Sequence, residues 1–118
     1  MKQERSNIKQ IKDSISWLFA EKIMPRLRAE WMTSSGDVIL EFLKDSGAAH
    51  NKQGITNNLH YRNVDVSYTT LNRRIPKLQD AELIEPIPGQ GKYYEITEKG
   101  GAYLRGDGDL RDEPEPDA

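Results

Sequence analysis

Apolar residues recur every three or four positions through the N-terminal part of the chain. Between residues 7 and 23 charged side chains separate them, and this spacing predicts an amphipathic helix. The apolar positions are Ile8, Ile11, Ile15, Trp17, Leu18, Phe19 and Ile23. Pro25 is expected to kink or restart the helix, and Leu27 and Trp31 continue the apolar stripe. So wide a stripe has to be buried, either against its own domain or against a second subunit.

Two shorter helices are predicted next by the same period. The first begins in the hydroxyl-rich segment 33–37, whose side chains can cap free amides, and ends at Gly47. The second covers roughly residues 52–59, and residues 60–63 are predicted to form a turn. The inward-facing residues of the two helices are Val38, Ile39, Phe42, Leu43, Ile55 and Leu59.

A third helix follows this turn, capped by Asp65 or Ser67. Its inner stripe consists of Leu71, Ile75 and Leu78. Pro76 lies inside it, where a proline removes a hydrogen bond and crowds the preceding turn. Because Leu78 stays in phase with the rest of the stripe, the sequence predicts one kinked helix rather than two.

The hydrophobic period changes after Ala81. Residues 83–85 and 93–96 predict two short strands, and the Pro- and Gly-rich segment 86–92 predicts the turn that joins them into a hairpin.

The C-terminal part of the chain is predicted to contain one more helix and a disordered tail. Thr97 is placed to cap a short helix over 98–104, with Ala102 and Leu104 facing inward. From residue 106 to the end there are two prolines, two glycines and six acids, and such a segment is not expected to order itself.

Three helices followed by a hairpin are typical of a winged helix-turn-helix. The predicted fold class is therefore mainly α with a small β-hairpin, extended by an N-terminal helix. The predicted division is an amphipathic helix and possible dimerisation element at 1–32, a DNA-binding domain at 33–105 and an acidic disordered tail at 106–118.

The net charge of −2 is the sum of two unlike parts. Six acids and one arginine give residues 106–118 a charge of −5, so residues 1–105 carry +3, and residues 52–77 carry five basic groups against one acid. The chain has no cysteine, no apolar run long enough to span a membrane and no secretory signal, which predicts a soluble cytoplasmic protein.

The outer face of the third helix carries the candidate binding residues. With Leu71 set at zero and 100° per residue, Thr69 at about 160° and Arg73 at about 200° point outward. Asn72 at about 100° flanks them, and Tyr68 at about 60° lies at the edge near the helix start. Arginine can pair with guanine, asparagine with adenine, and a threonine methyl can contact thymine. These four residues are predicted to read bases.

The predicted phosphate contacts lie around that face. They are Lys52, Arg62, Arg74, Lys77, Gln90 and Lys92. A charged helix face is by itself more often merely solvated. The order of the elements, the single acid among these charges and the glycine-bearing hairpin favour DNA binding over that alternative.

Several segments also resemble a known family. Residues 66–85, followed by 93–100 and 102–104, resemble the winged-helix regulators of haloarchaea and their viruses, and most closely the repressor-like family of the halophage phi-H. Residues 30–33 (Glu-Trp-Met-Thr) do so too, and the resemblance covers about residues 30–109. It implies a DNA-binding transcriptional regulator, a repressor, that works as a dimer.

Two features depart from that family. Glu82 stands where such domains usually have glycine, so it has to adopt a left-handed conformation or the helix has to end in another way. The N-terminal extension is not covered by the resemblance. Its apolar residues are predicted to form a homodimer contact, with packing on the same domain as the open alternative. The residues of the predicted contact are Ile8, Ile11, Ile15, Leu18 and Phe19.

No catalytic or metal-binding arrangement is evident. His50 and His60 lack a second set of ligands, and the serines lack a histidine and acid arrangement. No enzyme activity, cofactor, metal, small-molecule effector or membrane partner is therefore expected. The leading hypothesis is a dimeric repressor that binds an inverted-repeat DNA operator. The alternative is a winged-helix protein-interaction module that docks through its N-terminal helix without specific DNA binding.

Overall fold

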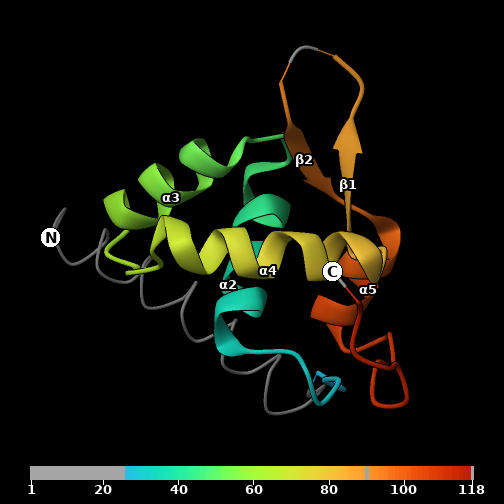
Figure 1. Cartoon of the computed structure of the whole chain (residues 1–118). Helices are drawn as coiled ribbons and strands as arrows, with labels where there is room; N and C mark the ends of the chain where they lie inside the picture. Colours follow the sequence, from blue (N-terminus) through green and yellow to red (C-terminus); the bar gives the residue numbers. More distant parts are fainter. Residues whose placement is uncertain (1–25, 90, 118) are drawn as a thin grey trace, which may run out of the picture.

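The computed structural model describes residues 26–89 and 91–117. Four helices and a two-stranded antiparallel sheet follow one another in the predicted order (Figure 1). These are α2 (Ser34–Ser46), α3 (Lys52–Tyr61), α4 (Tyr68–Asp80), β1 (Ile84–Ile87), β2 (Tyr93–Ile96) and α5 (Glu98–Arg105). The mainly α fold with a small hairpin is confirmed as a winged helix-turn-helix. The predicted N-terminal helix over 7–23 lies outside the described residues.

A side chain caps the start of each helix. Thr33, Asn51, Ser67 and Thr97 each accept a hydrogen bond from a backbone amide three residues further on. Of the two caps predicted for α4, Ser67 is therefore the one used. At its other end α2 stops at Gly47, as predicted, with a φ of 64°.

Helix α4 continues through Pro76 as one element. It ends at Asp80, and two residues further on Glu82 has a left-handed conformation with a φ of 64°. The first of the two conformations predicted for Glu82 is thus confirmed. The turn is held by the Leu83 amide, which donates to the Leu78 carbonyl at 2.9 Å, and by the Thr97 hydroxyl, which donates to the Glu82 carbonyl.

The hairpin differs from the prediction at its first strand. β1 begins at Ile84 rather than at Leu83 and continues through Pro86, which lies opposite Tyr94 in the antiparallel register. A proline is tolerated there because β1 is an edge strand. β2 pairs on its other side with His50, through two backbone hydrogen bonds of 2.8 and 2.9 Å between His50 and Tyr94.

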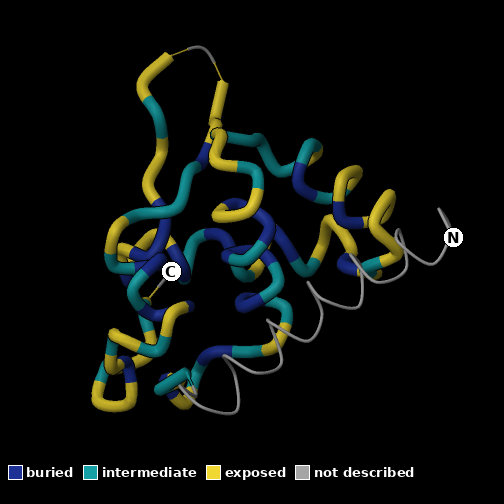
Figure 2. Tube along the Cα trace, turned by 180° about the vertical axis from the view of Figure 1, so that it is seen from behind, coloured by how far each residue is buried: buried dark blue, intermediate teal, exposed yellow. Residues whose placement is uncertain are grey.

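The core forms where α2, α4 and α5 pack together. Figure 2 shows the buried positions gathered toward the middle of the molecule, while the hairpin is largely exposed. The predicted inward residues of α2, α3 and α4 are buried, except that Val38 is half-buried. The prediction for α5 was wrong in part: Tyr103 is fully buried and Ala102 is only half-buried. The helix register therefore turns the large aromatic side chain, not Ala102, into the core.

The C-terminal segment contacts the domain, although the composition of 106–118 predicted a disordered tail. Leu110 is 1% exposed, and its amide donates to the Leu27 carbonyl at 2.9 Å. The Trp31 indole donates to the Glu113 carbonyl at 3.2 Å. One apolar anchor and these hydrogen bonds connect the segment to the rest of the domain.

A buried carboxylate links α2 to α5 and to the segment that precedes α2. Asp37 is 4% exposed and accepts a 2.7 Å hydrogen bond from the Tyr103 hydroxyl. It also forms an ion pair with Arg28. Burial raises the pKa of Tyr103 to about 12, and the hydrogen bond to Asp37 adds to this rise. Asp37 thus has the partners that a buried charge requires.

Replacement of Tyr103 by phenylalanine is expected to lower the free energy of unfolding by about 1–3 kcal/mol at neutral pH, because Asp37 loses a buried donor. The folded protein holds the phenol proton more tightly than the unfolded chain does. The stabilisation from Tyr103 is therefore complete below about pH 10 and is lost as the pH rises toward about 12. Urea unfolding at pH 7 and pH 11 measures both effects. An equal alkaline loss of stability in the wild type and in Tyr103→Phe would contradict the assignment.

Candidate nucleic-acid interface

Helix α4 separates its apolar face from its polar face as the sequence predicted. Leu71, Ile75 and Leu78 are at most 1% exposed. On the opposite side the four candidate base-reading residues are all exposed, with Tyr68 at 44%. These four residues are Tyr68, Thr69, Asn72 and Arg73. The buried stripe fixes the helix, so the outer side chains are presented from a rigid support.

The charge of this outer face is favourable for an anionic partner. Residues 68–79 of α4 contain no acidic residue, and the only acid in the helix is Asp80 at its last position. The Arg73 side chain is exposed and makes no hydrogen bond or ion pair with another residue in the described part of the chain. Its guanidinium is therefore available to a ligand.

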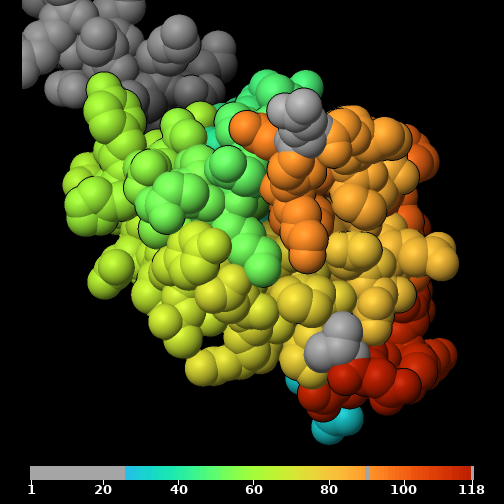
Figure 3. All heavy atoms as spheres, turned by 45° about the horizontal axis from the view of Figure 1, so that its top comes forward, coloured from blue at the N-terminus to red at the C-terminus, as the bar shows by residue number. Residues whose placement is uncertain are grey.

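Helix α3 adds a second cation at this face. Lys52, the first residue of α3, donates to the Asn72 side-chain oxygen at 2.9 Å. Figure 3 shows α3, α4 and the hairpin next to one another on one face of the molecule. Exposed Lys92 belongs to the hairpin, whereas Gln90 lies outside the described residues. The structure thus brings Lys52 together with the α4 residues.

Arg62 and Arg74 have partners inside the domain. Arg62 pairs with Asp45 at 2.8 Å, and its guanidinium lies 5.1 Å from the centre of the Phe42 ring, so it faces α2. Arg74 is half-buried and donates to the Trp31 carbonyl at 3.2 Å. The structure does not place either guanidinium with the exposed side chains of α4.

Lys77 is paired with the C-terminal segment. Its ammonium lies 2.7 Å from a Glu115 carboxylate oxygen, and its side chain is 14% exposed. This hydrogen bond and charge hold the pKa of Glu115 below its ordinary value. In Figure 3 the C-terminal residues border α4 at one end. An acidic side chain thus already occupies one predicted phosphate contact.

Sequence reasoning missed this contact, because composition alone predicted a disordered tail. The one available signal was Leu110, the only large apolar residue among 106–118. An isolated leucine in an acidic segment gives no information on where it will pack.

The two histidines have ordinary structural surroundings. The His50 ring lies 3.0 Å from the Ser46 hydroxyl and 4.8 Å, centre to centre, from the Phe42 ring. His60 is exposed in the last turn of α3. Among the described residues no cluster of three or more histidine, aspartate or glutamate side chains could hold a metal ion. Within the same residues no helix is long and apolar enough to cross a membrane.

Comparison with known proteins gives one informative match. No protein-family model and no curated protein matches the chain. Among solved structures, the chain is similar to the crystal structure of the PhiH1 repressor-like protein from Haloarcula marismortui. The two sequences are 30% identical, the TM-score is 0.64, and the match covers 77% of this chain and 97% of the other.

Proposed function

This chain belongs to the PhiH1 repressor-like family, and from that membership we propose that it is a sequence-specific DNA-binding transcriptional regulator. The similarity to a repressor-like protein suggests a DNA-binding regulator rather than an enzyme. The observation that carries the proposal is the outer face of α4, which is exposed, rigidly supported and free of acids over residues 68–79. Such a helix fits the major groove of DNA.

The chemistry of the exposed side chains supports base reading. Arg73 has a free planar fork of donors for the two acceptors of guanine, and Asn72 has the amide that pairs with adenine. Thr69 and Tyr68 extend this set toward the start of the helix. Lys52 at the start of α3 and exposed Lys92 in the hairpin are the candidate phosphate contacts.

We propose further that two copies bind an inverted-repeat operator as a homodimer and repress transcription. In that arrangement the two α4 helices read half-sites about 34 Å apart. The predicted dimer contact involves Ile8, Ile11, Ile15, Leu18 and Phe19, which lie outside the described residues and stay a prediction.

Footprinting on the DNA upstream of the protein's own gene tests the proposal, because small repressors often control themselves. The expected result is a protected inverted repeat. The protein should bind it more tightly than random DNA, and more weakly as the salt concentration increases. Binding without sequence preference would overturn the proposed regulator. Salt-insensitive association with a protein partner, without DNA binding, would support a protein-interaction module instead.

The ion pair between Lys77 and Glu115 gives a separate prediction. Glu115→Gln is expected to raise the affinity for DNA, because it frees the Lys77 ammonium for a phosphate. One added phosphate contact steepens the slope of log K against log salt by about 0.9. Fluorescence anisotropy over a salt series measures this slope. Asp117→Asn is the matched control, because it removes the same charge two residues away; an equal effect of both changes would show that net charge, not the Lys77 contact, is responsible.

A further inference from the structure

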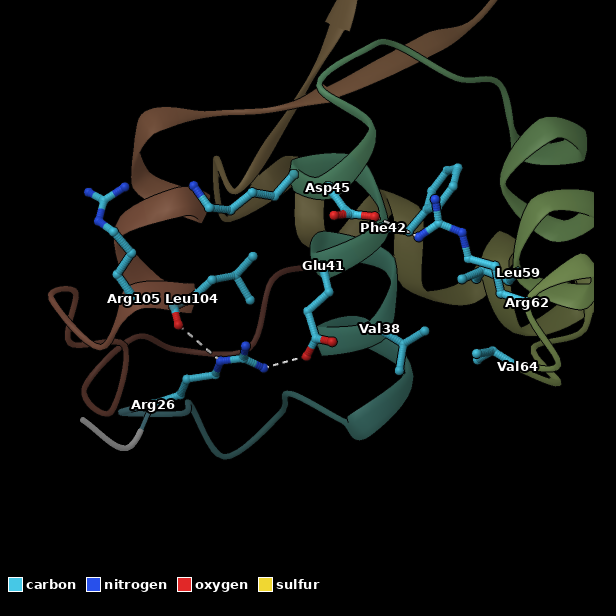
Figure 4. A pocket seen from close by; sticks show the side chains of 11 residues that line it. Arg26, Val38, Glu41, Phe42, Asp45, Leu59, Arg62, Val64, Leu104 and Arg105 are labelled. Carbon is cyan, nitrogen blue, oxygen red and sulfur yellow. Dashed lines mark hydrogen bonds and ion pairs between the residues drawn. The ribbon is translucent and has the colours of Figure 1, made fainter. Parts of the chain in front are cut away.

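An apolar groove runs along α2 and is separate from the outer face of α4. Phe42, Leu59 and Leu104, each at most 8% exposed, and half-buried Val38 and Val64 line a space of about 500 Å³. Figure 4 looks onto α2 with α4 behind it, so the groove opens on the side of α2 away from α4. A partner bound in this groove would leave the α4 face open for DNA.

The rim of the groove is charged. Arg26 pairs with Glu41 on one side, and Arg62 pairs with Asp45 on the other, where its guanidinium also covers the Phe42 ring (Figure 4). An apolar floor with a charged rim suits the apolar stripe and polar flanks of an amphipathic helix.

The sequence before the groove predicts such a helix. At 100° per residue, five apolar side chains of residues 7–23 fall within an arc of about 100°, and Gln10 falls on the opposite side. The five are Ile8, Ile11, Ile15, Leu18 and Phe19. A helix of this length spans about 25 Å. It is joined to the domain at Arg26, which itself lines the groove.

We infer that the groove binds the apolar face of residues 7–23 from a second copy of the chain, in a reciprocal exchange. The inference rests on the proposed function, which requires two subunits. Only Met24 and Pro25 lie between the predicted helix and Arg26. A proline disfavours the helical conformation in the residue before it, so the sequence predicts an extended conformation at Met24. A hinge so short and stiff favours exchange between copies over folding back onto the same domain.

The areas involved are consistent with a dimer. A helix about 25 Å long and 10 Å wide covers about 250 Å² on each of two surfaces, so two reciprocal contacts bury on the order of 1,000 Å². That is close to the lower limit for specific interfaces. Elsewhere on the described surface the exposed large apolar residues are Tyr61, Tyr68 and Tyr93, and Tyr68 is part of the α4 face. The groove is thus the apolar surface best suited to a second copy.

Light scattering after size-exclusion chromatography tests the inference without DNA. The full chain should have twice its mass of 13.5 kDa. Val38→Asp in the groove and Ile11→Asp in the N-terminal segment should each halve the measured mass. Gln10→Asp, on the opposite side of the predicted helix, should leave the dimer intact. Val64→Asp is the second groove variant, and circular dichroism confirms that each variant is folded.

Mixing the two monomeric variants distinguishes exchange from packing within one chain. The Val38→Asp chain keeps an intact segment and the Ile11→Asp chain keeps an intact groove, so the mixture should form a heterodimer through one of the two contacts. Any of three results would overturn the inference. The full chain could be monomeric, the dimer could survive both groove substitutions, or the mixture could contain no heterodimer. A full chain that binds its operator as a monomer overturns the groove assignment but not DNA binding. A groove-dependent dimer that binds no operator overturns the proposed function alone.

Discussion

Arg73→Ala is expected to weaken binding to the specific operator by about 1–3 kcal/mol and to relax the preference at a single base position. The Arg73 side chain is exposed on α4 and unpaired within the described part of the chain, so its substitution removes no side-chain hydrogen bond or ion pair there. Its loss should therefore leave the free energy of unfolding nearly unchanged. Competition binding with operators altered at one position at a time measures the change in preference.

Arg73→Lys separates base reading from charge at the same position. Lysine keeps the positive charge but lacks the planar fork that pairs with guanine. Arg73→Lys should thus lose most of the base preference while retaining the salt dependence. Lys92→Ala, in the hairpin, should instead weaken binding to all sequences alike and reduce the salt slope by about 1. If Arg73→Ala and Lys92→Ala had equal effects on operator and random DNA, Arg73 would not be a base-reading residue.

The faces of α4 could be predicted because the signals that determine them are local. The apolar period of Leu71, Ile75 and Leu78 and the cap at Ser67 both act within a few turns of the same helix. The left-handed conformation of Glu82 was one of two alternatives, and it came from the resemblance to a family that usually has glycine at this position.

The partners of the basic residues could not be predicted, because they are distant in sequence. Arg74 donates to Trp31, and Lys77 pairs with Glu115. The first contact depends on how the segment before α2 packs, and the second on where Leu110 anchors the C-terminal segment. A charge count treats every cation between residues 52 and 77 as available, whereas the fold leaves Arg73 exposed and engages Arg74 and Lys77.

The burial of the Asp37 carboxylate could not be predicted either, because it also depends on residues distant in sequence. In the sequence Asp37 is an acid in the first turn of a helix, where an exposed acid is favourable through the helix dipole. In the structure Tyr103, from the last helix, makes it part of the core. Only the packing of α5 on α2 distinguishes the two situations.

Gly100 and Gly101 are adjacent in α5, and both are buried, yet their replacement by alanine should have opposite effects. A Cβ on Gly100 would lie 2.3 Å from the Leu83 carbonyl oxygen and 2.8 Å from an Ile96 side-chain carbon. A Cβ on Gly101 would come no closer than 3.5 Å, to the end of the flexible Arg105 side chain. The close approach at Gly100 lets α5 pack directly on the backbone beside β1.

The backbone beside Gly100 cannot easily move away. The Leu83 carbonyl accepts a 3.0 Å hydrogen bond from the Thr97 amide, and the Thr97 hydroxyl in turn accepts from the Gly100 amide at 3.0 Å. A shift of α5 large enough to admit a methyl group would break both the cap of the helix and its link to the hairpin. Gly100→Ala is therefore expected to lower the free energy of unfolding by about 3 kcal/mol, at the upper end of the cost of overpacking.

Gly101→Ala is the matched control, because it adds the same methyl group one residue further along the same helix. Alanine loses less conformational freedom than glycine on folding into a helix, so this variant should be unchanged or more stable by up to about 1 kcal/mol. Urea unfolding of the two variants against the wild type measures the difference. Equal destabilisation by both would mean that α5 as a whole tolerates no added side chain. Equal stability would mean that α5 does not approach Leu83 as closely as the structure places it, and the position of the hairpin relative to α4 would then have to be revised.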